Sequence, residues 1–246
     1  MIFFETLVRM TAKGIRERNR AAIEAEILKL GKKQLAEVGA AALSLRSIAK
    51  ELEMTPSALY RYIENRDELL TRLIVDSFSS LAAACSKAES KVARSNFEAR
   101  FKALATALRK WSLAHPQEYG LIYGTPVPGF KASPNRTTSA GTRVFMLLAQ
   151  LGADMQSHVD DEMAKTGRFV EAVDLLDTAA VQGLAVDDFE FLQNVTPEII
   201  MNVLAAWNLI MGGLSAELFG HFGTGVDGAA MFDAWLDRAW DVARVK

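Results

Sequence analysis

Apolar residues recur at intervals of three and four along most of this sequence, which is the spacing of one face of an α-helix. No alternation of the kind that marks a half-buried strand stands out, so the pattern predicts an all-α protein. A first helix is expected from about Arg18 to Val38. Gly39 is expected to end it, because glycine adopts the left-handed conformation at little cost.

Shorter helices are expected next, each marked by a residue suited to the N-cap position. Ser44 is expected to cap a short second helix, and Thr55 a third helix that begins with a proline and ends near Glu64. Asn65, with Glu68 three residues further on, has the pattern of a capping box and is expected to start a long fourth helix.

Longer helices are expected beyond residue 90. The first spans Phe97 to Ala114 and is followed by a glycine- and proline-rich loop over residues 124–129. The later helices are expected near 136–164, 168–183, 197–220 and 228–244. The last two carry more large apolar surface than one small helical layer can hide, so we expect them to form an interface between two copies of the chain.

Composition narrows the class of protein. The sequence is 50% hydrophobic and 24% charged, as in a globular protein. A single cysteine, Cys85, excludes an internal disulfide and an all-cysteine zinc site, and favours a cytoplasmic location.

The apolar run at the N-terminus is too short for a secretory segment, and either Met1 or Met10 could be the start. The most apolar stretch, Leu204 to Phe219, contains Glu217 and two glycines, so a buried helix is expected there and no membrane association.

Charge is distributed unevenly along the chain. Residues 1–66 carry 12 Lys/Arg and 8 Asp/Glu, whereas residues 67–246 carry 16 and 22, so a basic head precedes an acidic body. Such a head suggests contact with a polyanion, although ordinary variation in surface charge gives the same imbalance. Part of the basic charge forms a candidate arm for the DNA backbone or minor groove, made of Lys13, Arg16, Arg18 and Arg20.

The segment Leu45 to Ile63 has the pattern of a helix-turn-helix, two short helices joined by a tight turn. A helix that enters the major groove must be slim at its leading end and braced from behind. Thr55 and Ser57 are small enough for close approach to DNA, and Arg46 can reach a guanine edge or a phosphate. Two packed helices of another purpose give a similar pattern, but the predicted helix start beside Arg66 adds a phosphate-binding feature.

Residues 44–70, SLRSIAKELEMTPSALYRYIENRDELL, closely resemble the DNA-binding signature of TetR-family repressors. The resemblance implies a three-helix DNA-binding head followed by a larger helical domain for ligand binding and dimerisation. It places Arg46 and Ser57 near bases. Glu53 departs from the family, which usually has glycine there, so a left-handed turn would cost on the order of 1 kcal/mol. The DNA-binding residues expected from the segment and the resemblance are Ser44, Arg46, Thr55, Pro56, Ser57, Tyr60, Arg61, Tyr62 and Arg66.

The resemblance is weaker beyond residue 80. Residues 110–130, with Trp111 and the pair His115-Pro116, nevertheless look like one C-terminal subtype of TetR regulators. Aromatic residues and methionines suit an adaptable cavity for a small apolar or amphipathic effector, although for any one of them a core position is favoured. The candidate pocket residues are Trp111, Tyr119, Tyr123, Phe145, Met155, Phe169, Trp207 and Met211.

Asp154, His158 and Glu162 share a helical face and are potential metal ligands, but a solvated acidic face is favoured, and no metal or other cofactor is expected. The sequence has no nucleophile elbow, phosphate loop or dinucleotide fingerprint, so no enzymatic activity is expected.

Together these patterns predict a DNA-binding domain over residues 1–64 and an effector-binding and dimerisation domain over 65–246. We expect a homodimer through the helices near 197–220 and 228–244 that binds a palindromic, double-stranded operator and is released by a small molecule. The alternatives are a helical enzyme that binds a small molecule and a protein-interaction module.

Overall fold

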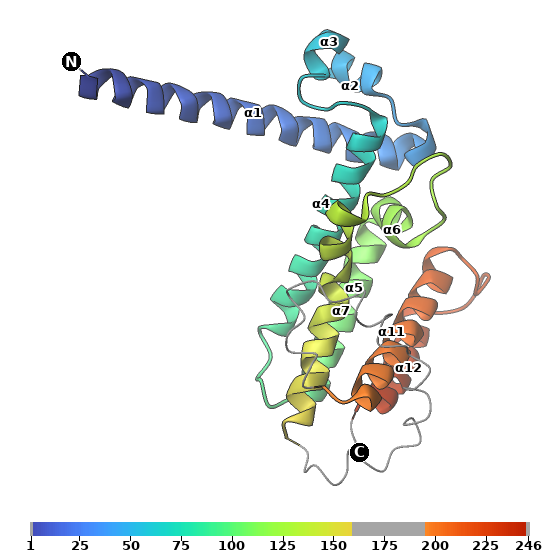
Figure 1. The fold of residues 1–246 in the computed structure, drawn as a ribbon. Helices are drawn as coiled ribbons and strands as arrows, with labels where there is room; N and C mark the ends of the chain where they lie inside the picture. The colour runs from blue at the N-terminus through green and yellow to red at the C-terminus, as the bar shows by residue number, and fades with distance from the viewer. Residues whose placement is uncertain (1, 159–194, 245–246) are drawn as a thin grey trace. The chain divides into compact units, whose positions relative to one another are not determined.

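The computed structural model describes residues 2–158 and 195–244, and every regular element in these ranges is a helix (Figure 1). The predicted all-α class is therefore confirmed. The elements are α1 (Ile2–Val38), the short 3₁₀ helix η1 (Ala40–Ala42), α2 (Leu45–Glu51), α3 (Pro56–Leu59), α4 (Arg66–Glu89), α5 (Phe97–Ala114), α6 (Pro116–Tyr123), α7 (Pro134–Gln156), α11 (Pro197–Leu218) and α12 (Gly228–Ala243).

The chain divides into two compact units. The first contains residues 1–77 and 117–137, and the second contains residues 78–116 and 138–246. The border expected at residue 64 therefore differs from the border of the first unit. The physical reason is that Leu121, Val127 and Phe130 pack against the core of the helix-turn-helix head.

The core of the first unit lies where α1, α2, α3 and α4 meet. Ile27, Ile48 and Leu59 are each at most 1% exposed there, and they pack with leucines of α4. Gly31 of α1 allows a close approach, since a Cβ atom at this position would lie 3.1 Å from Cδ1 of Leu69. The close packing of these buried aliphatic side chains holds η1, α2 and α3 against α1 and α4.

Helix α1 is longer than the sequence pattern predicts. It begins at Ile2, whereas the apolar stripe predicts a start near Arg18. The segment before Arg18 lacks proline and contains many good helix formers, so the helix continues there. The predicted end is confirmed, since α1 ends at Val38 and Gly39 has a φ of 76°.

Three predicted N-caps are confirmed. Ser44 Oγ accepts a hydrogen bond from the Ser47 N–H, Thr55 Oγ1 from the Ala58 N–H, and Asn65 Oδ1 from the Glu68 N–H. Two details differ from expectation. The α-helix after Thr55 ends at Leu59 and continues only as turns, and the Glu68 carboxylate binds Arg72 and Arg136 instead of closing the capping box.

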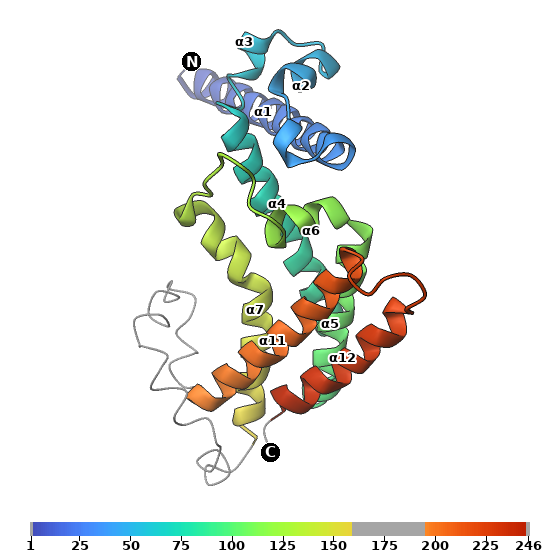
Figure 2. The same ribbon diagram turned by 90° about the vertical axis from the view of Figure 1, so that its right-hand side faces the viewer.

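In the second unit, α5 has the predicted bounds, and the bounds of α11 and α12 agree with the predicted ones to within two residues. Helices α11 and α12 lie side by side (Figure 2). Gly152 of α7 lets α11 approach closely, because a Cβ atom there would lie 2.9 Å from side-chain carbons of both Ile199 and Val203. The predicted helix over 168–183 and the end of the one over 136–164 lie outside the described residues.

A buried ionic network joins three helices of the second unit, and the sequence pattern did not predict it. Arg100 of α5 is 1% exposed, and its Nε donates to Glu89 of α4 at 2.6 Å. Its Nη2 donates to Asp154 of α7 at 2.7 Å. A buried guanidinium requires such paired acceptors, because an uncompensated charge in the core is strongly destabilising.

Two helices are long and apolar enough to cross a membrane by length and composition alone. They are α4, with a mean hydropathy of 1.3 and 56% of its apolar window buried, and α11, with values of 1.6 and 33%. The core helix of a globular protein passes the same test, and the apolar face of α4 packs within the chain. Helix α11 leaves more of its apolar surface uncovered.

Candidate DNA-binding site

The turn between α2 and α3 is a Schellman motif closed by a residue other than glycine. The Met54 N–H donates to the Ala49 carbonyl at 2.8 Å, and the Glu53 N–H donates to the Lys50 carbonyl at 3.1 Å. This pattern requires a left-handed residue after the helix, and Glu53 has a φ of 53°. The expected left-handed turn at Glu53 is confirmed, so α3 leaves α2 at a tightly defined angle.

The leading end of α3 presents small polar side chains. Thr55, Pro56 and Ser57 are exposed, and the hydroxyls of Thr55 and Ser57 lie 3.1 Å apart in a mutual hydrogen bond. Behind them Leu59 is 1% exposed and anchors the helix in the core. The element thus has the slim leading end and the apolar back that entry into a major groove requires.

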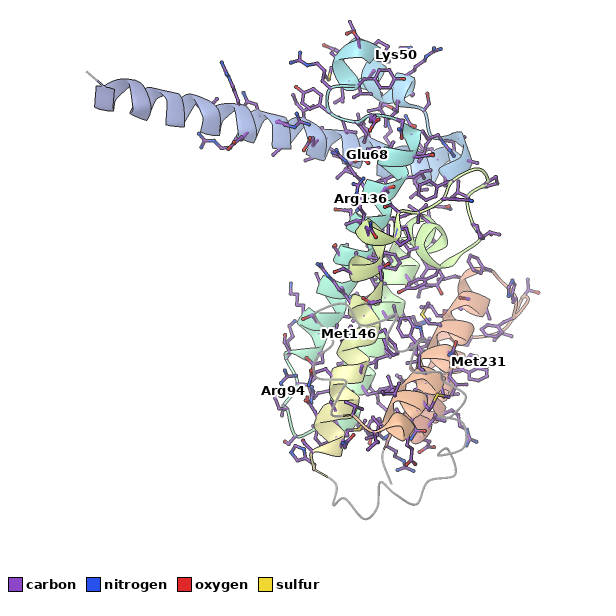
Figure 3. All side chains as sticks on the ribbon, viewed as in Figure 1. Lys50, Glu68, Arg94, Arg136, Met146 and Met231 are labelled. Atoms are coloured by element: carbon purple, nitrogen blue, oxygen red, sulfur yellow. The ribbon has the colours of Figure 1, made fainter. Side chains whose placement is uncertain are left out.

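Charged and aromatic side chains surround this leading end. Arg46, in the first turn of α2, and Arg61, after α3, are exposed, and Tyr60 is 50% exposed. Tyr62 is less exposed than Tyr60, because its ring packs against the core of the head. The Arg20 guanidinium lies over this ring, with its Cζ 5.6 Å from the ring centroid. Lys50 lies at the outer end of the same head, on α2 (Figure 3).

Two of the predicted DNA-binding residues also have structural partners. Ser44 is half-buried, its backbone N–H donates to Gln34 Oε1 at 3.0 Å, and its hydroxyl caps α2. Arg66 Nη2 donates to the carbonyls of Ala40 at 2.8 Å and Ala41 at 3.2 Å, which ties the start of α4 to η1. The buried Gln34 could have been suspected from its position beside Leu35 in an apolar stripe.

An ionic cluster joins α1, α4 and α6 within the first unit. Lys32 Nζ lies 2.7 Å from the Asp76 carboxylate and 3.0 Å from that of Glu118, which also accepts a hydrogen bond from Ser77 at 3.0 Å. Burial lowers the pKa of Lys32, but the hydrogen bonds to the two carboxylates outweigh it, and the net pKa is raised. The cluster keeps Lys32 charged and attaches α6 to the head.

A second ionic cluster attaches α7 to the start of α4. Glu68 accepts hydrogen bonds from Arg72 Nε at 2.7 Å and from both terminal nitrogens of Arg136, which lies close to it (Figure 3). The hydrogen bond from Arg136 is the main cause that lowers the pKa of Glu68 below 4.5. Segment 117–137 is therefore held to the head by ionic as well as apolar contacts.

The candidate pocket residues are not brought together in one unit. Tyr119 and Tyr123 belong to the first unit, and Phe169 lies outside the described residues. Trp111, 5% exposed, donates its indole N–H to Ser80 at 3.0 Å, as a core residue does.

The remaining pocket residues lie in the second unit, where the rings of Phe145 and Trp207 meet edge to face with centroids 6.4 Å apart. Met155 is 5% exposed and Met211 half-buried. An open hollow along α5 is lined instead by alanines, lysines and a threonine, so it is not the predicted cavity.

The potential metal ligands also have other partners. The Asp154 carboxylate accepts hydrogen bonds from Arg100 and from Gln150, and the His158 Nδ1 lies 2.8 Å from the Asp154 carbonyl. Glu162 lies outside the described residues. Within the part of the chain that the structure describes, no group of three or more His, Cys, Asp or Glu side chains is placed to hold a metal ion.

Comparison with known proteins connects both parts of the chain to one family. The family model described as bacterial regulatory proteins, tetR family, matches residues 27–73, and that described as tetracyclin repressor-like, C-terminal domain, matches residues 101–239. The HTH-type transcriptional regulators Rv1816 of Mycobacterium tuberculosis and Mb1846 of Mycobacterium bovis are each 36% identical over 228 residues, which cover 90% of this chain and 92% of theirs.

Solved structures agree with these matches. The structure of the protein SCO4313 is 34% identical, has a TM-score of 0.73, and covers 92% of this chain and 98% of its own. The TetR-family regulator PfmR from Thermus thermophilus, at 17% identity and a TM-score of 0.52, covers 89% and 98% and shares the fold alone.

Proposed function

Because the chain belongs to the TetR family of DNA-binding transcriptional regulators, we propose that it is a ligand-responsive repressor. In this proposal it acts in the cytoplasm, binds a palindromic operator as a dimer, and is released by a small apolar or amphipathic molecule. The family consists of transcriptional regulators and not of enzymes, so the enzyme alternative is set aside. The observation that carries the proposal is the exposed, small-residue leading end of α3 on a rigid core.

In the proposed complex α3 enters the major groove with its first turn foremost. Ser57 and Arg46 are near bases, and the hydroxyls of Thr55 and Tyr60 meet phosphates on either side. Exposure of these four side chains supports the assignment. Arg61 is exposed beside them, whereas Ser44, Tyr62 and Arg66 combine a phosphate contact with the structural contacts described above.

Dimerisation is required because one head covers too little DNA for high affinity, whereas two heads on a twofold axis bind two half-sites. We assign the interface to α11 and α12. The apolar window of α11 is only 33% buried within one chain, and Phe219 at its end is 48% exposed. The exposed face of α11 includes the small residues Ala205 and Gly212, which allow a second helix to approach closely.

A charged substitution on this face tests the interface. Ala205→Arg is expected to convert the dimer to a monomer in sedimentation analysis, because a guanidinium would be buried between helices without a partner. Ala83→Arg, at an exposed alanine of α4, is the matched control and is expected to leave the dimer intact. A dimer that survives Ala205→Arg would place the interface elsewhere.

Release by a ligand is assigned to α4. This helix supplies residues 66–77 to the first unit and 78–89 to the second, so a ligand that favours another position of its second half also acts on the head. Helix α6 is expected to move with the head, because Glu118 of α6 forms an ion pair with Lys32 of α1. DNA affinity then falls by a factor that is set by the ratio of the ligand's affinities for the released state and for the DNA-binding state. A ligand that binds but leaves DNA affinity unchanged would contradict this part.

Selection of bound fragments from genomic DNA tests the proposed function. The wild-type protein is expected to enrich fragments that share a palindrome, with half-sites separated by about 10 base pairs or a multiple of that distance. Arg46→Ala is expected to lose the enrichment. Arg143→Ala, at an exposed arginine of α7, is the matched control and is expected to retain it. Enrichment by neither the wild type nor the control would contradict the proposal.

A further inference from the structure

The N-terminal part of α1 lies outside the core of the head. Among the described side chains of α1, Ile27 is the first that is buried, while residues 15–22 are exposed, and Ile15 is 51% exposed. At 1.5 Å per residue the helix between Ile2 and Arg20 is roughly 27 Å long. Figure 1 shows this part of the helix projecting beyond α2 and α3 toward the N-terminus. Between Ile15 and Ala22, therefore, no side chain of the helix enters the core of the head.

Its charges follow the helical period. Positions 9, 13, 16 and 20 are all Lys or Arg, and their spacing of four, three and four places them on one face. Arg18, which the sequence groups with the candidate arm, lies on the opposite face, and its Nε donates to the Gly14 carbonyl at 3.2 Å. Arg18 is therefore not part of the basic face. Residues 9–20 include five Lys/Arg and one acidic residue, Glu17. The segment therefore carries a strong excess of positive charge, and Arg16 on its basic face is exposed.

The inner end of this basic face lies against the end of the recognition element. Arg20 Nη2 donates to the Arg61 carbonyl at 3.4 Å, and its guanidinium lies over the Tyr62 ring. Arg20 also pairs with Glu24 at 3.0 Å, so the inner end has a fixed place. Because Arg16 shares the helical face of Arg20, the basic face continues outward to at least Arg16 on the side of α1 that meets the residues after α3.

We propose that this basic face binds the phosphates of the DNA that flanks each half-site; the proposal rests on the proposed function. Successive positions of the stripe are about 4.5–6 Å apart along the axis, which is one to two base-pair steps of about 3.4 Å. The face therefore matches a run of phosphates. It adds affinity without reading sequence and lengthens the footprint beyond the two helix-turn-helix elements.

Binding to two lengths of one duplex tests the proposal. The duplex is the palindrome selected by the wild-type protein, either trimmed to the two half-sites or extended by about one helical turn, roughly 10 base pairs, at each end. Arg16→Gln removes one charge from the basic face, and Arg18→Gln removes one from the opposite face. Both are exposed arginines of the same helix, and glutamine keeps a high helix propensity, which circular dichroism verifies.

Arg16→Gln is expected to reduce the slope of log affinity against log salt by about 1 per protomer on the extended duplex. That corresponds to roughly eightfold weaker binding per lost contact near 0.1 M salt. On the trimmed duplex, and for Arg18→Gln on both duplexes, binding is expected to equal that of the wild type. Equal behaviour of the two variants on the extended duplex would overturn the proposal and leave the function intact.

Two other outcomes are separable. If the wild type binds neither duplex above the non-specific level, the proposed function itself fails. A basic amphipathic helix can also bind anionic membranes, so flotation with vesicles of phosphatidylglycerol and phosphatidylcholine is run in parallel. Vesicle binding that Arg16→Gln abolishes, with an unchanged DNA salt slope, would overturn the DNA assignment.

Discussion

Replacing Glu53 by glycine is expected to stabilise the protein. Glu53 occupies the left-handed position of the Schellman motif after α2, with a φ of 53°, and its side chain is exposed. A residue with a Cβ atom carries a cost there of about 1–2 kcal/mol, and glycine does not. The greater freedom of glycine in the unfolded chain offsets about 0.4–1 kcal/mol of that gain. The expected net gain in the free energy of unfolding is therefore about 0.5–1 kcal/mol, or roughly 1–4 °C in Tm.

The matched control is Glu53→Ala. It removes the same carboxylate, which is unfavourable at the C-terminal end of a helix, but it keeps the Cβ atom in the left-handed conformation. Urea unfolding and thermal unfolding of the three proteins measure the difference between glycine and alanine, which isolates the backbone effect. Glu53→Asn is expected to fall between them, because asparagine tolerates this conformation. Equal stabilities of the glycine and alanine variants would refute the reasoning.

Three further predictions concern packing, burial and pH. Gly152→Ala is expected to lower Tm, because its new methyl group would meet two branched side chains of α11 at 2.9 Å. Gly120→Ala, with open space around it, is expected to maintain or raise Tm in the same scan. Cys85 is expected to react with iodoacetamide only on unfolding, since burial raises its pKa to about 12; rapid labelling of the native protein would contradict this. The lowered pKa of Glu68 predicts stability that is present above pH 4.5 and lost as pH falls through that lowered value. In urea titrations at several pH values, Glu68→Gln or Arg136→Gln should therefore cost stability at neutral pH and little in acid, and a cost that persists in acid would refute it.

Local features of the head could be predicted from sequence because each depends on neighbouring residues. Ser44, Thr55 and Asn65 each accept a hydrogen bond from the N–H group three residues further on, so their capping roles are encoded in the spacing. Gly39 ends α1 and Glu53 turns the chain for equally local reasons. The helix-turn-helix was recognisable on this basis.

Features that depend on distant residues could not be predicted. The position of Arg66 at the start of α4 predicts a phosphate contact. It does not predict that the guanidinium also donates hydrogen bonds to carbonyls of η1. Segment 117–137 joins the head because Glu118 meets Lys32, a contact across 86 positions of the chain with no local signal. The border predicted at residue 64 follows helix order, whereas the compact unit follows these contacts.

Aromatic spacing is a weak guide to a cavity for the same reason. Trp111 and Met155 are buried by their neighbours in the second unit, while Tyr119 is fully buried in the first. Side chains that suit a ligand pocket equally suit a core, and only the packing separates the two. The effector pocket therefore stays a prediction.

Titration of a selected operator duplex across a salt series tests the central claim most directly, with fluorescence anisotropy to follow binding by the wild type, Arg46→Ala and Arg143→Ala. The account predicts tight binding by the wild type and the control that weakens steeply with salt, because many phosphates are neutralised. It also predicts a loss in Arg46→Ala of about 1–3 kcal/mol per head. Equal affinities of Arg46→Ala and the wild type, or binding that does not respond to salt, would contradict the assignment of this head to DNA.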